Sequence, residues 1–286
     1  MRYLTLSCAL VLLLIGASPA TRPTDITTLT QTLATDWSAR LKEEKFHVTV
    51  APPFVIAGNL TEAQLAGYRD RTILAAQKAL TATYFKTPID RPILILLFAD
   101  PATYQRLADT WFHDKSVPHY GFYRHSDRTM LMNIATGGGT LVHELTHALI
   151  APDFPDVPDW FNEGLASLYE QSQIDGNTIT GLPNWRLPAL QRAIQNKTLR
   201  PLAELIEDDD FRDDKLEGIN YAQARYLMQY LQYLQDRKQL PAYYVAFREG
   251  HAKDATGLAT LKSLIAPKSL DEFEKDWRAW VLTLRF

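Results

Sequence analysis

The stretch TLVHELTHALI, residues 140–150, places three polar side chains within an apolar segment, and the fold must bury that segment while giving these side chains partners. The apolar residues are typical of a buried helix, yet the stretch also carries His143, Glu144 and His147. Burying such groups costs free energy unless each finds a partner. The sequence therefore predicts that something lies opposite these three side chains and satisfies them.

The flanking residues set the bounds of the predicted helix. Thr140 is a good N-cap, and Pro152 disfavours helix at the residue before it, so we expect the helix to span residues 141–150. At about 3.6 residues per turn, His143 and His147 then lie one turn apart on one face. Two imidazoles placed in this way can approach a single cation.

Glu144 completes the pattern H-E-x-x-H, in which two histidines bind zinc and the glutamate acts as general base. It projects to the edge of the histidine face and can reach a water on the metal without being a ligand. A lone histidine on an apolar face is usually a core residue, but the full pattern arises by chance in only on the order of one chain in a hundred. The pattern therefore predicts a metal site.

A catalytic zinc generally has a third protein ligand besides its water. The stretch VPDWFNEGLASLYEQ, residues 157–171, provides Glu163, which follows His147 by sixteen positions. Asp159 can cap a helix that begins at the next residue. Gly164 would let the backbone approach the first helix closely. Glu163 is therefore the predicted third ligand.

The first twenty residues read as a signal peptide. Arg2 precedes the apolar run YLTLSCALVLLLIGASPA, and the small residues Ser18 and Ala20 predict cleavage after Ala20. The alternative is an uncleaved N-terminal membrane anchor. No later run is long and apolar enough to span a bilayer. The chain is thus expected to be exported, either to the periplasm or as a secreted protein.

The cysteine count and the net charge limit the kinds of metal ligand and of binding partner that the chain can have. Cys8 is the single cysteine, so the mature chain would have neither disulfides nor thiolate ligands, and a metal must be bound by nitrogen and oxygen. The formal net charge of −3 and the lack of a long basic run give no reason to expect a nucleic-acid partner. The acidic run at residues 207–217 lacks the spacing of an EF-hand and is predicted to be a solvated loop.

Hydrophobic periodicity predicts an α+β protein with a single domain at residues 21–286. Residues 21–150 are expected to form a small mixed sheet with helices, and residues 151–286 a mainly helical part. Strands are predicted at residues 46–51, 54–58, 92–98, 120–124 and 129–134, with a further hairpin at 173–181. Other helices are predicted at residues 24–44, 61–85, 102–112, 187–196, 220–237, 242–249, 258–265 and 270–284.

HELTH followed by PDWFNEGLASLYE resembles the gluzincin metallopeptidases, most closely the peptidase MA-like family of exported bacterial proteins. In that family a helix with H-E-x-x-H precedes W-F-x-E-G-x-A, and the similarity extends from about residue 46 to residue 234. The resemblance implies a zincin-like fold and one Zn²⁺ ion per chain. It makes His143, His147 and Glu163 the ligands and Glu144 the general base.

The resemblance also implies a role for Tyr221, which opens the stretch YAQARYLMQYL. In better-studied gluzincins a tyrosine from a comparable region donates a hydrogen bond to the tetrahedral oxyanion. The alternative is an aromatic residue at a helix start that packs on the core. A peptide substrate is expected to lie along an edge strand at residues 129–133, paired by β-augmentation.

The chain also departs from the family pattern. The interval between His147 and Glu163 is shorter than in thermolysin or the aminopeptidase N group, and no G-A-M-E-N stretch precedes the helix, so exopeptidase action through that motif is not supported. Ser167 stands where thermolysin-like enzymes carry an aspartate that orients a histidine. Glu170 and Asp159 are the candidates to replace that aspartate.

The expected function is zinc-dependent hydrolysis of peptide bonds in a peptide or protein substrate. Glu144 would take a proton from a zinc-activated water and pass it to the leaving nitrogen. One alternative is an exported protein that holds zinc structurally or binds peptide without cleaving it. Another is an amidase that acts on cell-wall material. The intact H-E-x-x-H favours catalysis, because a structural site needs no Glu144.

Overall fold

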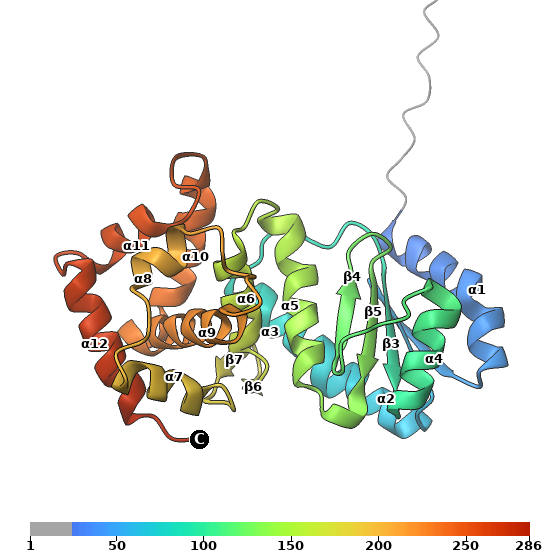
Figure 1. Ribbon diagram of the computed structural model, residues 1–286. Helices are drawn as coiled ribbons and strands as arrows, with labels where there is room; N and C mark the ends of the chain where they lie inside the picture. The colour runs from blue at the N-terminus through green and yellow to red at the C-terminus, as the bar shows by residue number, and fades with distance from the viewer. Residues whose placement is uncertain (1–24) are drawn as a thin grey trace, which may run out of the picture.

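A computed structural model describes residues 25–286, so the predicted signal peptide, its cleavage site and Cys8 lie outside the described residues. The protein has two halves side by side, a sheet with its covering helices and a cluster of helices (Figure 1). The predicted α+β class is confirmed, with a small mixed sheet in the N-terminal part and a helical C-terminal part. Within residues 25–286, no helix combines the length and apolarity needed to cross a bilayer.

The sheet has the strand order β1-β2-β3-β5-β4. Its central strands β2, β3 and β5 run parallel, and the edge strands β1 and β4 are each antiparallel to their neighbour. The strands are β1 (His47–Ala51), β2 (Phe54–Gly58), β3 (Ile93–Phe98), β4 (Gly121–Arg124) and β5 (Thr129–Asn133).

The prediction that residues 129–133 form an edge strand is wrong. These residues are β5, which lies between β3 and β4 and is buried along its whole length. The free edge belongs to β4, whose residues after Gly121 are only half-buried. The apolar run TMLMN suits a strand covered on both faces, so β5 takes the inner position of the hairpin and leaves the edge to β4.

Helices cover both faces of the sheet. One face packs on α1 (Ile26–Glu43) and α4 (Pro101–Phe112), where the apolar cluster is centred on alternate residues of β2 and β3. The other face packs on α3 (Ala75–Thr83) and α5 (Gly139–Asp153). The predicted helix at residues 61–85 forms with an interruption: α2 (Glu62–Tyr68) continues through the π-helical η1 (Arg69–Leu74) into α3.

The C-terminal half is built around the long helix α9 (Glu217–Tyr233), which packs along α6 (Asp159–Leu168). A short hairpin, β6 (Ser172–Asp175) and β7 (Thr178–Gly181), lies beside them. The remaining helices are α7 (Leu187–Gln195), α8 (Leu202–Glu207), α10 (Gln239–Gly250), α11 (Leu258–Ile265) and α12 (Leu270–Thr283). Short 3-10 segments are η2 (Ile134–Thr136), η3 (Leu234–Arg237) and η4 (His251–Lys253). The sequence did not predict α8.

Gly164 allows a close approach, but to a helix other than the predicted one. A Cβ at this position would lie 3.1 Å from the Cβ of Ala224 and 3.2 Å from its backbone oxygen. The glycine therefore lets α6 pack against α9, not against α5. Because Glu163 is the neighbouring residue in α6, the packing of α6 on α9 also sets the position of the predicted third ligand.

Asp153 ties the two halves together at the end of α5. Its carboxylate accepts hydrogen bonds from the backbone N–H groups of Lys86 and Thr87 at 2.9 and 2.7 Å, and these residues belong to the sheet half. From α10, the Tyr244 hydroxyl and Arg248 donate at 2.7 and 2.6 Å. Burial acts to raise the pKa of Asp153, but these contacts outweigh it and lower the pKa to about 2.

The same contacts explain why α5 is longer than predicted. The helix runs through Pro152 to Asp153 instead of ending at residue 150. A proline this close to a helix end removes a single backbone hydrogen bond. The side chain of Asp153 holds the last turn in place.

We expect Asp153→Asn to lower the free energy of unfolding by about 2 kcal/mol at neutral pH, because an amide weakens the charge-assisted hydrogen bonds of the carboxylate. Urea unfolding of the wild type and the variant would measure the difference. Arg285→Gln is a suitable control, because this exposed arginine bonds only the carbonyls of the chain end.

The stability difference should also depend on pH with a defined sign. The folded-state pKa of Asp153 lies below its ordinary value of 3.8, so the carboxylate stabilises the fold fully above about pH 4 and progressively less as the pH falls towards 2. The gap between wild type and Asp153→Asn should therefore be constant from about pH 5 to 7 and narrow below about pH 4. A gap that stays constant down to pH 2 would contradict this assignment.

Candidate metal centre

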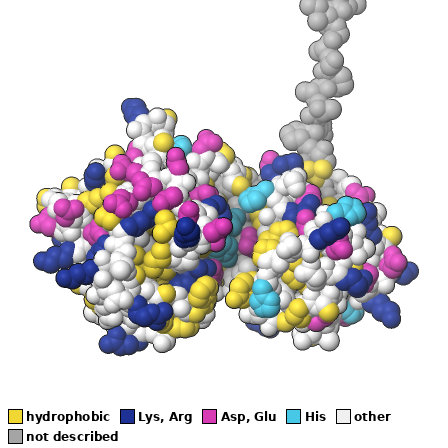
Figure 2. Space-filling model, viewed as in Figure 1, with side chains coloured by type: hydrophobic (Ala, Val, Ile, Leu, Met, Phe, Trp, Pro, Cys, Tyr) yellow, Lys and Arg dark blue, Asp and Glu magenta, His cyan; other side chains and the backbone are white. Residues whose placement is uncertain are grey.

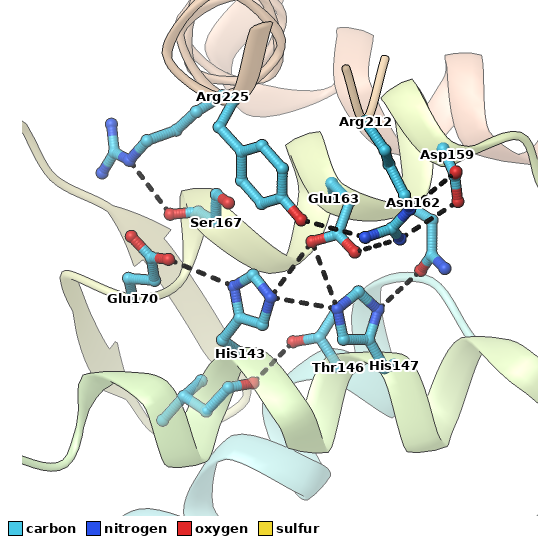
Figure 3. A network of polar contacts seen from close by, with 12 residues as sticks. His143, Thr146, His147, Asp159, Asn162, Glu163, Ser167, Glu170, Arg212 and Arg225 are labelled. Atoms are coloured by element: carbon cyan, nitrogen blue, oxygen red, sulfur yellow. Dashed lines mark hydrogen bonds and ion pairs between the residues drawn. The ribbon is translucent and has the colours of Figure 1, made fainter. Parts of the chain in front are cut away.

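The three predicted ligands converge on one point (Figure 3). The Nε2 atoms of His143 and His147 are 3.0 Å apart, and Glu163 Oε2 lies 3.2 and 3.5 Å from them. All three residues are buried, and one ligand atom from each lies within 4.8 Å of the others. Two histidines one turn apart on α5 and one glutamate from α6 thus form a compact group of two nitrogens and one oxygen.

The group fits a metal ion, because its atoms are poorly satisfied by the protein alone. Glu163 Oε2 is buried and, among the described residues, has no hydrogen-bond donor in suitable alignment. The facing Nε2 atoms of His143 and His147 can bond each other only if one carries a proton. A cation would take all three lone pairs at once. The residues present could therefore hold a metal ion.

The electrostatics of the group reflect close packing of unlike charges. Burial lowers the pKa of His143, but its contacts with Glu163 and Glu170 outweigh burial and raise the pKa to about 10. Burial acts to raise the pKa of Glu163, but the two histidines hold it well below its ordinary range. The carboxylate is therefore ionised and available as a ligand.

Each histidine has a polar partner at Nδ1, the ring nitrogen that does not face the other two ligand atoms. His143 Nδ1 lies 3.2 Å from Glu170 Oε1, as expected for one of the two named candidates. His147 Nδ1 bonds the side-chain oxygen of Asn162 at 2.8 Å, a partner that was not predicted. The signal for Asn162 was its place beside Glu163, one residue before the ligand. Such contacts fix the ring so that Nε2 faces the ion.

Glu170 is in turn held by the loop after β7. Arg186 donates two hydrogen bonds to its carboxylate at 3.0 and 3.3 Å, and the side chain of Asn184 donates a third at 3.1 Å. Burial acts to raise the pKa of Glu170, but His143 and Arg186 lower it to about 2. The partner of His143 is thus a carboxylate.

Two predicted helix caps are wrong. The N-cap of α5 is Gly138, and Thr140 lies inside the helix, because the glycines before it fit where a side chain would not: a Cβ at Gly139 would lie 2.3 Å from the backbone oxygen of Glu170. Helix α6 starts at Asp159 after Pro158, so Asp159 is not its cap. Nor does Asp159 orient a histidine, since its carboxylate is engaged by Arg212.

Arg212 is a second residue of the site, besides Asn162, that sequence analysis missed. It belongs to the acidic run predicted to be a solvated loop, yet its guanidinium bonds Glu163 Oε1 at 2.7 Å and the carboxylate of Asp159 at 2.8 and 3.1 Å. The neighbouring Phe211 is buried. An aromatic residue in the middle of an acidic run was the available signal that this loop packs on the protein.

Tyr221 lines the cleft at the site and also packs on a neighbouring aromatic ring, so it has features of both alternatives, the hydrogen-bond donor and the packing residue. Its hydroxyl oxygen accepts a hydrogen bond from Arg212 at 3.3 Å, and its ring lies 5.3 Å from that of Phe211. Burial and the charge of Glu163 raise its pKa, so the phenol stays protonated at neutral pH. A protonated phenol can donate a hydrogen bond.

Glu144 lies on α5 beside the ligands but is not one of them. Its side chain is half-buried and lines the same cleft, and burial raises its pKa. The cleft has a volume of about 960 Å³ and lies in the hollow between the two halves (Figure 2). One wall is strand β4; the other is formed by the helical half. Exposed aromatic side chains, Tyr120 and Trp185, line the two sides.

A family model described as a protein of unknown function (DUF1570) matches residues 137–249. No curated protein matches the chain. The matched segment begins at the glycine loop before α5 and ends in α10, so it includes His143, His147 and Glu163 and the partners Asn162, Glu170 and Arg212. It covers less than half of the chain and carries no statement of activity.

We expect the wild-type protein, purified without chelator, to contain about one metal ion per chain, and His147→Ala to contain almost none. Removal of one of three protein ligands leaves an incomplete site. Elemental analysis of both proteins measures this directly. A metal-free wild type that also takes up no added zinc or cobalt would contradict the assignment.

A weaker effect is expected for Asn162→Ala, which removes the hydrogen bond to His147 Nδ1 and keeps every ligand. Loss of such an orienting contact lowers metal affinity by roughly 10- to 100-fold in comparable sites. Competition with a chromogenic chelator gives the affinity. Asn196→Ala serves as control, because Asn196 lies at the end of α7, outside the cleft.

Proposed function

We propose that the protein is a zinc-dependent metallopeptidase that hydrolyses peptide bonds in the cleft between its two halves. The observation that carries the proposal is the convergence of both histidines of H-E-x-x-H with Glu163, while Glu144 lies on the same helix outside the ligand group. The resemblance of HELTH and WFNEGLA to the gluzincin metallopeptidases supports it.

Zinc is the metal that the donor set favours. Two imidazole nitrogens and one carboxylate oxygen are the protein ligands of several catalytic zinc sites, where a water takes the fourth position. When bound, zinc supplies a water of lowered pKa and polarises a carbonyl oxygen. The burial of all three ligands beside an open cleft suits a site that must meet both its ion and a substrate.

In this proposal Glu144 moves the proton. Its carboxylate accepts a proton from the attacking water and gives it to the leaving nitrogen of the peptide. The residue follows His143 on α5, so it reaches the same region without occupying a ligand position. A structural metal site would have no use for this carboxylate, and this observation favours an enzyme over a binding protein.

The substrate is proposed to lie along β4. Among residues 25–286, β4 pairs with no strand other than β5, so no further strand covers its outer edge. Gly121, Phe122 and Tyr123 of this strand line the cleft. An extended peptide can add to such an edge by backbone hydrogen bonds. Tyr221, on the opposite wall, would donate a hydrogen bond to the oxyanion.

Export of the enzyme by the predicted N-terminal signal peptide is part of the proposal. It would bring the site to peptides or proteins outside the cytoplasm. Processing is tested by sequencing the N-terminus of the protein recovered from the culture medium and from the cell envelope. The predicted mature chain begins after Ala20.

We expect Glu144→Gln to retain the metal and to lose peptidase activity by roughly 100- to 10,000-fold, because the amide cannot accept the proton. The measurement is cleavage of a mixture of quenched fluorescent peptides, with the metal content of the same samples as control. A variant that keeps its metal and the wild-type rate would show that Glu144 is not the base. Cleavage of peptidoglycan fragments but of no peptide would favour the amidase instead.

A further inference from the structure

Arg212 contacts two residues of the proposed active site: Glu163, a proposed metal ligand, and Tyr221, the proposed oxyanion donor. Its loop, residues 208–216, is firmly held before it reaches the cleft. Arg200 pairs with Asp210 at 2.6 Å, and Phe211 is buried. The side-chain amide of Asn220 donates to the backbone oxygen of Phe211 at 3.0 Å. The loop therefore presents the next residue, Arg212, in a fixed place.

The guanidinium is oriented by Asp159. Its Nε and Nη2 atoms donate to the two carboxylate oxygens of Asp159 at 2.8 and 3.1 Å, which is a paired, planar contact. Asp159 is the first residue of α6, one turn before Glu163 on the same helix. Arg212 is thus fastened to the helix that carries the third ligand.

The same Nη2 atom donates to Glu163 Oε1 at 2.7 Å. The other oxygen, Oε2, faces the two histidines at 3.2 and 3.5 Å. Because Arg212 holds Oε1, the carboxylate of Glu163 cannot rotate freely, and Oε2 is the oxygen turned towards the histidines. Arg212 therefore determines which oxygen binds and in which direction its lone pair points.

The third nitrogen reaches Tyr221. Arg212 Nη1 donates to the phenol oxygen at 3.3 Å. Because a guanidinium only donates, the phenol oxygen accepts in this contact and keeps its own hydrogen for another acceptor, Glu163 or a substrate oxygen in the cleft. A lysine, with a single ammonium, cannot make these planar contacts together.

We propose that Arg212 is a positioning residue that fixes Glu163 as a single-oxygen ligand and holds Tyr221 as a hydrogen-bond donor. The part that concerns Tyr221 rests on the proposed function; the part that concerns Glu163 rests on the ligand group alone. One side chain then couples the affinity for the metal to the geometry of the oxyanion donor.

The first test is metal affinity. Arg212→Lys and Arg212→Met are compared with the wild type by competition for Zn²⁺ with a chromogenic chelator, and their Co²⁺ spectra are recorded. We expect affinity to fall roughly 10- to 100-fold and the Co²⁺ absorption to change, as when other contacts that orient ligands are removed. The matched control is Arg106→Lys, which breaks the paired contact of Arg106 with Glu44 on the exposed surface of α4.

Asp159→Asn is a control for misfolding of the loop. It weakens the hydrogen bonds that hold the Arg212 guanidinium and substitutes neither a residue of the loop nor Glu163. It should weaken zinc binding in the same direction by a smaller factor, with thermal unfolding in chelator unchanged. Unchanged zinc affinity and Co²⁺ spectra in both Arg212 variants would overturn the inference.

The second test is a double-mutant cycle on turnover with Tyr221→Phe. If Arg212 positions the phenol, Tyr221→Phe should reduce the rate much less in the Arg212→Lys background than in the wild type. Independent, multiplicative effects would contradict the Tyr221 part. If the wild type cleaves no peptide, the proposed function fails, yet a loss of zinc affinity in the Arg212 variants would still support the Glu163 part.

Discussion

The burial of two imidazoles and a carboxylate at the junction of the two halves is the constraint on which the surrounding structure depends. Such groups lose their contacts with water on burial, and polar groups of the protein must replace those contacts. Each ligand has one such partner, supplied by a different segment of the helical half. The partners are Glu170 for His143, Asn162 for His147 and Arg212 for Glu163. Three segments of the helical half thus supply the polar contacts of the group.

That shell requires close packing as well as polar contacts. Gly164 lets α6 rest on α9, and the buried Arg225 of α9 donates to the carbonyls of Ser167 and Leu182. Burial lowers the pKa of Arg225 to about 10. Its charge satisfies backbone oxygens where α6 ends. The position of Glu170, just beyond that end, follows from this arrangement.

The features that the sequence predicted correctly are those set by local periodicity. The one-turn spacing of His143 and His147 and the helix that carries Glu163 need only a few neighbouring residues, and both were predicted. Among contacts between separate segments, Glu163 and Glu170 were named as candidates beside the histidines, but Arg212 was not. Arg212 lies far from Glu163 in the chain, and no spacing rule connects them. The inner position of β5 depends likewise on pairing with β3, so its apolar run indicated burial but not its neighbours.

The free edge of β4 has a consequence for the behaviour of the protein in solution. Unpaired strand edges invite other sheets and lead to aggregation unless something protects them. Here the helical half forms the opposite wall of the cleft, and Trp185 and Tyr221 are among the residues that line it. The helical wall therefore limits the approach of another sheet to this edge, although β4 itself contains neither proline nor lysine.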